Sequence, residues 1–471
     1  MKYRFYLFGV VFILQLLNIF TDINYIPSYR FLPLEPIIRA SEKNKVLPKG
    51  KGFPEVHQHK DGGYVMKRTM KKAAAGAALA ALILSMSACS GSAGTGSDSG
   101  SGGKSEGSGS DTLTVAIWDN GQKAGLDAII ADFTEATGNK AQIQVINWDQ
   151  YWALLEAGAT GGELPDVFWM HSNEAYRYMS NGILMDLTDR IAGSEKLDMD
   201  KFPEDIRTLY QNEGKTYAVP KDIDTIALWY NKTMFDEAEM AYPDESWTWD
   251  DYYEAAVKLT KEDGSQFGTA MNPTNNQDGW MNMVYAMGGH VISEDKTKSG
   301  FDDPDTIKAM EYVEKLVKDA MPSAATMSET GNDVLFYSGK IAMLPFGSWM
   351  IAPIKENEYV TANCDVTVLP KDAETGRRVS IYNGLGWAVN ANTKNADAAW
   401  QLVEWFGSKE GQERQAELGV SMSAYDGVSE GWKNNTDLFD LQPYLDMRED
   451  VVFRPYSKTT VAWENQISED L

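Results

Sequence analysis

The order of strand-like and helix-like segments near the start of the ordered chain constrains the fold more than any other feature. Segment 112–118 alternates apolar with small or polar residues, the period of two that is typical of a strand. In 126–133 the apolar residues recur at helical spacing. Segments 142–147, 151–157 and 166–170 then have the character of a strand, a helix and a strand. This order predicts an α/β fold with a parallel, doubly wound sheet.

Further helices are expected later in the chain, and the ordered part is too long for one core. Thr248, with Asp251 three residues on, has the spacing of a helix cap, and Asp303 precedes a proline at a helix start. The apolar residues of 399–406 mark another buried helical face. Because residues 112–471 exceed what a single core holds, we expect two α/β lobes.

The composition excludes several classes of function. The formal net charge is -25, from 68 acidic and 43 basic residues, and such a surface repels nucleic acid. With only two cysteines the chain has no disulfide framework, and its four scattered histidines fit no zinc motif. We therefore expect no nucleic-acid partner, no metal and no cofactor.

Residues 66–88 have the layout of an export signal that leads to Cys89. A basic start is followed by the apolar run 73–84 and then by small residues. Segment 84–90 resembles the bacterial lipobox, which implies a lipidated Cys89; the alternative is a buried helix with an accidental cysteine. Residues 89–111 would then be the lipidated cysteine and a flexible Gly/Ser tether. The expected location is the cell membrane, anchored by lipid on the extracellular face or in the periplasm.

Residues 1–65 precede this signal, although an export signal normally stands at the start of a chain. We hypothesise that translation begins at Met66 or Met70 and that 1–65 is upstream sequence, with Gly62-Gly63 recording a ribosome-binding site read as codons. The alternatives are a disordered segment or a genuine amino-terminal membrane helix in the apolar run 6–20.

Nine segments of the mature chain follow one another in a familiar order. They are 164–169, 181–187, 217–220, 229–235, 247–249, 288–289, 336–349, 369–370 and 384–394. Together they resemble the family 1 extracellular solute-binding proteins of bacterial ABC importers, the group that contains maltose-binding protein. The resemblance implies a monomeric binding protein that captures a sugar or oligosaccharide by hinge closure and passes it to the transmembrane subunits of an ABC permease, touching the membrane through its lipid anchor only.

The resemblance also implies a periplasmic-binding-protein-like fold, with two doubly wound lobes joined by a multi-strand hinge and the ligand between them. By analogy, 112–222 and 363–418 form lobe one, and 223–362 and 419–471 form lobe two. Relatives usually continue past the segment that resembles 462–465 through a final helix. We therefore expect either a truncated C-terminus or a second lobe without that helix.

Candidate ligand contacts in lobe one follow the strands. Sugar sites combine aromatic planes with polar groups, and in open α/β sheets ligands bind beyond the carboxyl ends of strands. Such positions are occupied here by Trp118, Asp119, Asn120, Trp148, Asp149, Trp169 and His171. The alternative for the tryptophans is a place in the core, as expected for most of the 14 Trp and 22 Tyr. His171 has no metal-ligating neighbours in the sequence and is interpreted as a hydrogen-bonding residue.

Candidate contacts also occur at the crossovers and in lobe two. Asp222 and Asp224 stand where the chain passes between lobes, either as ligand contacts or as part of a solvated hinge. By resemblance, Trp349 of the Gly-Ser-Trp segment corresponds to an aromatic that stacks on the ligand. The remaining candidates are Trp280, Tyr382, Asn383, Arg454 and, more weakly, Tyr456. Arg454 has the alternative of simply pairing with an acid.

No catalytic motif accompanies these residues. The chain lacks the nucleophile-elbow, zinc-protease, Walker and dinucleotide-binding patterns, so we expect a binding protein and not an enzyme. Because carboxylates are plentiful, a surface glycoside-active enzyme stays open as an alternative. A receptor for a non-sugar solute and an adhesin with no small ligand also stay open.

Overall fold

The computed structural model describes residues 112–271 and 277–470. All of these lie in one compact unit, Gly102–Leu471. The expected signal peptide, Cys89 and the tether lie outside the described residues. No helix in the described ranges is long and apolar enough to cross a membrane.

The first sheet confirms the doubly wound arrangement predicted for the start of the ordered chain. Its five strands run in the order β2 (Lys140–Val145), β1 (Thr112–Ile117), β3 (Val167–Met170), β12 (Gly386–Val389) and β6 (Ala218–Pro220). Strand β1 pairs in parallel with both β2 and β3. Strand β12, from much later in the chain, is antiparallel to β3 and β6. The carboxyl ends of β1 and β3 therefore meet at one edge.

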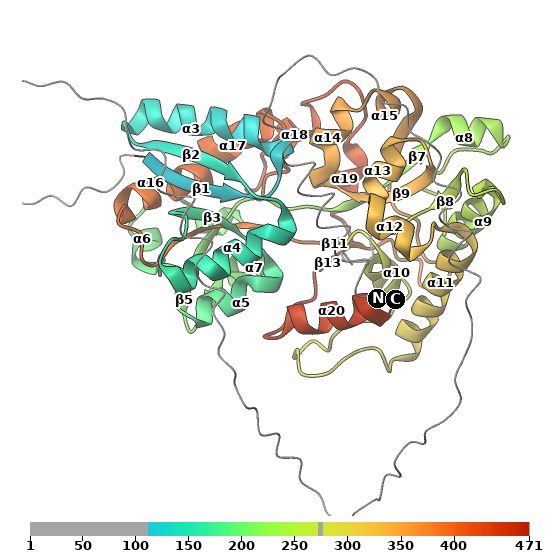
Figure 1. The fold of residues 1–471 in the computed structure, drawn as a ribbon, viewed down its shortest axis with the longest axis horizontal. Helices are drawn as coiled ribbons and strands as arrows, with labels where there is room; N and C mark the ends of the chain where they lie inside the picture. The colour runs from blue at the N-terminus through green and yellow to red at the C-terminus, as the bar shows by residue number, and fades with distance from the viewer. Residues whose placement is uncertain (1–111, 272–276, 471) are drawn as a thin grey trace, which may run out of the picture. The chain divides into compact units, whose positions relative to one another are not determined.

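Helices cover both faces of this sheet (Figure 1). On one face lie α3 (Lys123–Thr137), α16 (Ala396–Gly407) and α17 (Lys409–Glu417), which contact one another. On the other lie α4 (Trp148–Gly161), α5 (Ser172–Ser180) and α7 (Glu204–Leu209). Helix α3 ends where Gly138 takes the left-handed conformation, with φ of 78°. We call this sheet and its helices the first lobe.

The second sheet has four strands in the order β10 (Cys364–Thr367), β7 (Ile226–Asn231), β9 (Ile341–Gly347) and β8 (Phe267–Thr269). Together with its helices it forms the second lobe. Around it lie α8 (Lys232–Glu237), α9 (Trp249–Leu259), α10 (Trp280–Ala286), α11 (Pro304–Ala320), α12 (Ala324–Thr330), α13 (Asn332–Tyr337), α14 (Ile351–Glu356) and α15 (Glu358–Asn363). Thr248 and Asp251 form the expected capping box of α9. Asp303 caps α11 ahead of its N1 proline.

Two details of the expected lobe boundaries differ in the structure. Strand β10 was expected in lobe one but pairs with β7 of the second sheet, since β7 is buried along its whole length and β10 completes its ladder. The chain therefore re-enters the first sheet only at β12. The short helix α18 (Glu430–Lys433), expected in lobe two, packs on α17 of the first lobe.

Two crossing segments, 221–225 and 383–385, join the sheets directly. The first links β6 to β7, and the second links β11 (Ser380–Tyr382) to β12. They pair at Asp224 and Asn383, and Asp222 pairs with Ser423 on the neighbouring segment. Strand β11 also pairs in parallel with β13 (Val451–Phe453). The expected multi-strand hinge is therefore a small hydrogen-bonded layer between the lobes.

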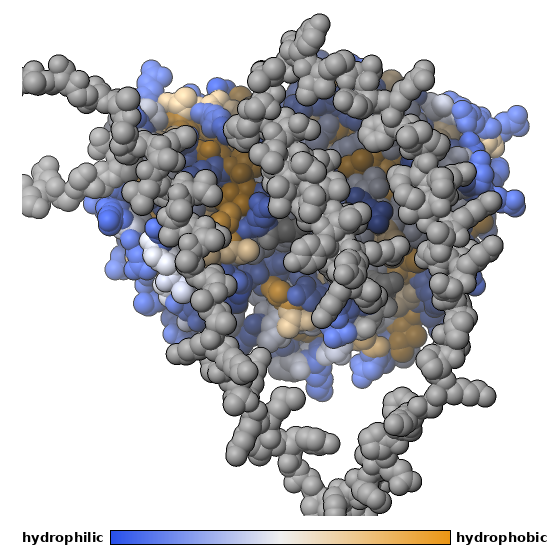
Figure 2. Space-filling view, viewed as in Figure 1, coloured by the Kyte–Doolittle hydropathy of each residue, from blue (hydrophilic) through white to orange (hydrophobic). Residues whose placement is uncertain are grey.

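The remaining elements are short, apart from the last helix. They are α6 (Thr188–Ala192), α19 (Gln442–Asp446), α20 (Thr460–Asp470), the hairpin of β4 (Gln211–Asn212) and β5 (Lys215–Thr216), and the 3-10 turns η1 (Asn120–Gln122), η2 (Met199–Lys201) and η3 (Ser348–Met350). Helix α20 contacts α5 of the first lobe and packs Trp463 and Ile467 on the second core. On the face seen in Figure 2 the uncovered outer rim is mainly hydrophilic, in keeping with the acidic composition.

Candidate binding site

The carboxyl edge of the first sheet carries an aromatic wall formed by Trp118, Trp148, Trp152 and Trp169. Trp118 follows β1, and its ring makes edge contacts with the rings of Trp148 and Trp169, with centroids 5.1 and 4.9 Å apart. Trp148 begins α4 and keeps 39% of its surface exposed, whereas Trp169 in β3 is fully buried behind Trp118. The predicted convergence of Trp118, Trp148 and Trp169 is therefore present, with Trp148 on the open face.

The acids beside these tryptophans differ in their surroundings. Asp119 accepts hydrogen bonds from Gly121 N at 2.8 Å and from Gln122 Nε2 at 2.9 Å, so it caps the turn that follows β1. Burial raises the pKa of its carboxyl. Asn120 is exposed, and Asp149 lies in α4 with its side chain outside the described set.

His171 joins the edge of the first sheet to the second crossing segment. Its Nε2 lies 3.0 Å from Asn383 Nδ2, and its Nδ1 lies 2.7 Å from Asn173 Oδ1. Burial, with the nearby Arg454 charge adding to it, lowers the pKa of His171 to about 3. The imidazole is therefore neutral at physiological pH. Both ring nitrogens therefore lie within hydrogen-bonding distance of polar neighbours, in line with the hydrogen-bonding role that the sequence indicated.

The crossover acids Asp222 and Asp224 tie the crossing segments together, and the burial of Asp222 contradicts the solvated-hinge interpretation at that position. Asp222 is 5% exposed, pairs with the ammonium of Lys221 and accepts from Leu385 N at 2.9 Å. Asp224 Oδ1 accepts from Asn383 N at 2.9 Å and also from Gln277 Nε2. Burial is the largest cause of the strongly raised pKa of Asp224, and the charge of Asp222 adds to it. Both carboxylates thus bind one crossing segment to another.

Lys221, which the sequence analysis did not select as a candidate, is a buried cation in the hydrogen-bonded layer between the lobes. It is fully buried, and its Nζ donates to Gln122 Oε1 at 2.9 Å and to Ser421 Oγ at 3.0 Å in addition to the Asp222 pair. The same ammonium lies 4.7 Å from the centroid of the Trp169 ring. Because lysine is usually exposed, this position could not be recognised from the residue type.

The second-lobe candidates do not all face the aromatic wall. Trp280 was expected to contact ligand, but it is fully buried in the second core, where its ring makes an edge contact with Phe301 at 5.7 Å. The reason is that α10 turns this side chain inward. Trp349 is half-buried beside Gly347 and packs on the second core. Tyr382 is nearly buried, with an edge contact to Phe453 at 5.3 Å.

Arg454 and Asp278, an acid that the sequence did not single out, complete the polar groups at the junction of the lobes. Arg454 is 5% exposed and its Nη2 donates to Glu464 Oε1 at 2.6 Å, so this arginine does pair with an acid, while its Nε has no partner among the described residues. Asp278 is 6% exposed, and burial raises its pKa to about 7. We call His171, Asp224, Asp278, Asn383 and Arg454 the junction cluster.

Three buried atoms of the junction cluster have no hydrogen-bond partner within the described residues. They are Asp278 Oδ1, Asn383 Oδ1 and Arg454 Nε. Trp169 Nε1, in the buried part of the aromatic wall, also has no partner among the described residues. Buried polar groups are nearly always paired in native proteins, so this concentration of two acceptors and two donors marks a place suited to a polar ligand. Among the described residues no group of three or more His, Cys, Asp or Glu side chains is placed to hold a metal ion.

A family model of the bacterial extracellular solute-binding proteins matches residues 118–413, more than half of the chain. The chain belongs to this family. Its members are substrate-binding proteins and not enzymes, so this solute-binding protein has a binding role.

Known relatives and solved structures agree with this membership. The solute-binding protein is 24% identical over 323 residues to the galactooligosaccharide-binding protein of Bacillus subtilis, covering 64% of this chain and 70% of the relative. It is 22% identical over 341 residues to the multiple sugar-binding protein of Streptococcus mutans, covering 68% and 77%. A structure of an ABC substrate-binding protein from Listeria monocytogenes in complex with cycloalternan matches with a TM-score of 0.69 at 22% identity, over 76% of this chain and 92% of that one. The predicted two-lobed fold is therefore confirmed.

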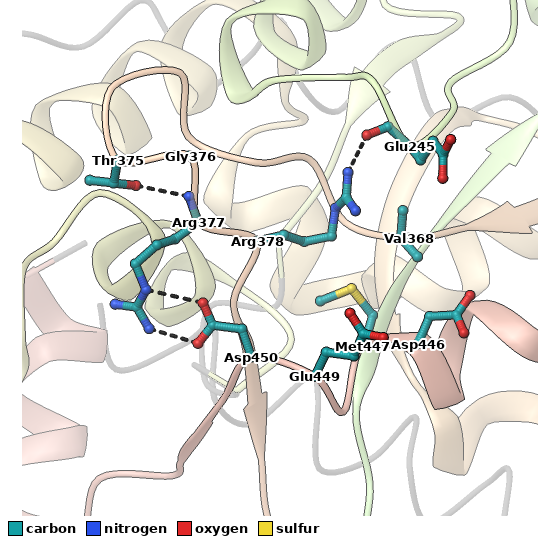
Figure 3. Close-up of a pocket in the computed structure, with 10 residues that line it drawn as sticks. All are labelled: Glu245, Val368, Thr375, Gly376, Arg377, Arg378, Asp446, Met447, Glu449 and Asp450. Atoms are coloured by element: carbon teal, nitrogen blue, oxygen red, sulfur yellow. Dashed lines mark hydrogen bonds and ion pairs between the residues drawn. The ribbon is translucent and has the colours of Figure 1, made fainter.

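The solute-binding protein also has a polar pocket of about 560 Å³ elsewhere in the second lobe (Figure 3). None of the predicted site residues lines it. Its two arginines are already engaged: Arg377 makes a two-pronged pair with Asp450 at 3.0 and 2.8 Å, and Arg378 Nε donates to Leu369 O at 2.7 Å. The junction cluster, with its unpaired buried groups beside exposed aromatic surface, is the better candidate for the ligand site.

Proposed function

We propose that this solute-binding protein captures a sugar or oligosaccharide between its two lobes and delivers it to an ABC permease. The observation that carries the proposal is the junction cluster, where buried donors and acceptors without partners adjoin the aromatic wall. Sugar hydroxyls both donate and accept hydrogen bonds, and sugar C–H faces pack on aromatic rings. A carbohydrate uses both surfaces at once, whereas an amino acid or phosphate uses neither in full.

The names of relatives support a carbohydrate ligand. The galactooligosaccharide-binding and multiple sugar-binding proteins match most of this chain. Their specificities belong to those proteins.

The proposed mechanism is closure of the lobes about the crossing segments. The ligand first packs on the aromatic wall of the first lobe and is then contacted by Asp278 from the second lobe and by Arg454 from the layer between the lobes. A ligand shifts such an equilibrium only by binding the closed form more tightly than the open one. The backbone pairing of Asp224 with Asn383 supports a pivot at this position, because it fixes the two crossing segments to each other.

The proposed location is the outer face of the cell membrane, with lipid on Cys89 and residues 91–110 as a tether. The test is cell fractionation. Protein from a gene that starts at Met66 should be found in membranes, and Cys89→Ser should move it to the soluble or secreted fraction. An unchanged distribution of the variant would remove the anchor from the proposal.

The decisive test of ligand class is a binding screen of the purified full-length chain. We expect one neutral mono- or oligosaccharide to raise the melting temperature and change tryptophan fluorescence, since a ligand that binds only the folded state stabilises it. Recovered sugar should be chemically unchanged. A response to amino acids, polyamines or phosphates, with none to a broad glycan panel, would overturn the sugar assignment.

A further inference from the structure

We infer that Asp278 and Arg454 form a specificity-determining pair that reads one hydroxyl group of a neutral carbohydrate. The inference rests on the proposed function and deepens it, because it names the second-lobe contact and the charge class of the ligand.

The two side chains reach the junction from distant parts of the chain, Asp278 from the second lobe and Arg454 from the layer between the lobes. Asp278 stands just before α10, and Arg454 directly follows β13. Each is at least nine-tenths buried, and each has one polar atom without a partner among the described residues, Oδ1 in Asp278 and Nε in Arg454. Leaving such atoms unpaired is unfavourable, so both favour a ligand atom that completes them.

Asp278 and Arg454 interact electrostatically although they form no salt bridge with each other. No salt bridge joins Asp278 to Arg454 among the ion pairs of the described chain, yet the arginine charge acts on the carboxyl and lowers its pKa against the larger effect of burial. A hydroxyl group donates one hydrogen bond and accepts others, so one hydroxyl placed between them accepts from Nε and donates to Oδ1. An ammonium or a carboxylate supplies only one half of that pattern.

The other members of the junction cluster place a second hydroxyl nearby. The Arg454 charge acts on His171 as well as on Asp278, so the arginine lies near both. His171 is bonded to Asn383, whose Oδ1 is the remaining unpaired acceptor. A sugar ring presents neighbouring hydroxyls at a spacing that suits two such contacts.

The charge balance of the junction disfavours an acidic sugar. Arg454 of the junction cluster is already paired with Glu464, and the nearby Lys221 is paired with Asp222. Asp119, Asp224 and Asp278 add further carboxyls whose pKa values are raised by burial. A uronate or sugar phosphate would bring another negative charge into this group without a free cation among the described residues of the junction to receive it.

The pair should make ligand binding depend on pH. A hydroxyl donates to the ionised carboxylate of Asp278, so binding favours the deprotonated form and should weaken as pH falls below about 7. The charged and titratable groups that act on or face this carboxyl are Arg454, Asp333 and Tyr444. These groups, like Asp119 and Asp224, are unchanged in a variant at 278, so the difference between the two proteins isolates Asp278.

The test is calorimetric titration of the full-length chain with the neutral sugar that best stabilises it, at pH 6 and pH 8. We expect Asp278→Asn to weaken binding at least tenfold at pH 8 and to flatten the pH dependence. Asp205→Asn is the matched control, because Asp205 is also partly buried with a raised pKa but lies in α7, outside the junction cluster. It should bind like the wild type.

Arg454→Lys provides a second variant should Asp278→Asn fold poorly. It keeps a positive charge beside Glu464 but replaces the guanidinium, and with it the Nε donor, so we expect weaker binding with the pH dependence retained. Wild-type affinity in both variants, with the wild-type pH dependence, would overturn the inference and leave the proposed function intact. Binding of a uronate more tightly than its neutral counterpart would also overturn it. A wild-type chain that binds no carbohydrate would instead refute the proposed function itself.

Discussion

Asp224 and Asn383 bind the two crossing segments to each other in both directions. Asp224 N donates to Asn383 O at 3.0 Å, and Asn383 N donates to Asp224 Oδ1 at 2.9 Å. The first bond is ordinary strand pairing, whereas the second uses a side chain in place of a backbone carbonyl. Gln277 Nε2 donates to the same carboxyl oxygen. One aspartate therefore links the crossing segments to the loop that carries Asp278.

Removing this carboxyl should loosen the hinge. Asp224→Ala leaves the Asn383 amide and the Gln277 side chain without their acceptor, and we expect a loss of about 1–3 kcal/mol in the free energy of unfolding. Asp224→Asn keeps an acceptor oxygen and should lose less. Urea titration of both variants checks this, with Asp437→Ala as an exposed control. Equal losses for Ala and Asn would mean that the acceptor oxygen is not what matters.

Lys221 should be among the most sensitive positions for stability. In Lys221→Met the unbranched methionine side chain occupies the same space, but the ammonium that donates to Asp222, Gln122 and Ser421 is lost. Breaking a buried pair in this way costs about 3–5 kcal/mol, because the partner charge stays buried. Chemical denaturation measures it, and the exposed Lys258→Met in α9 is the control. A loss no larger than that of the control would show that Asp222 does not need its partner.

The open face of the aromatic wall should contribute directly to affinity. Trp148→Ala removes the most exposed ring of the wall, and we expect ligand binding to weaken by about 1–3 kcal/mol, or roughly 5- to 150-fold. The fold should persist, because this ring keeps 39% of its surface exposed. Calorimetry gives the affinity, and Tyr242→Ala, at 38% exposure in the second lobe, is the control. Unchanged affinity would place the ligand away from this wall.

His171 should make the fold acid-sensitive. Its folded pKa of about 3 lies below the ordinary value of 6.5, so between these values the unfolded chain binds a proton that the folded chain does not. Stability from this group is therefore lost as pH falls, by about 2 kcal/mol between pH 7 and pH 5. Asp278 acts in the opposite direction, because its folded pKa is raised.

A comparison of variants separates these two effects. His171→Gln removes only the histidine contribution, so the wild type should lose about 2 kcal/mol relative to this variant over that pH range. Denaturation of both proteins at pH 7 and pH 5 gives the difference. A difference that does not change with pH would show that His171 becomes protonated in the folded state.

The features that the sequence predicted well depend on residue spacing within one segment, or on the rule that ligands bind at the carboxyl edge of a parallel sheet. Trp118, Trp148 and Trp169 were expected together because they follow neighbouring strands, and strand ends of a parallel sheet meet at one edge. The N-terminal cap of α9 could be predicted because a capping box spans only four consecutive residues.

What the sequence did not predict depends on long-range pairing and on side-chain direction. The membership of β10 in the second sheet is decided by its partner β7, more than a hundred residues earlier. Trp280 turned inward because of the phase of α10, which its apolar sequence left undetermined. The burial of Lys221, Asp278 and Glu464 follows from tertiary packing, which their charged residue types do not reveal.

The position of β12 within the first sheet has a consequence for how the molecule is made. This strand lies between β3 and β6, yet it leaves the ribosome after the whole second sheet has been synthesised. Until then the first sheet lacks an inner member, and β3 and β6 present unpaired edges. Such non-local pairing slows folding. The sheet edge that carries the aromatic wall is therefore complete only after most of the chain has been synthesised.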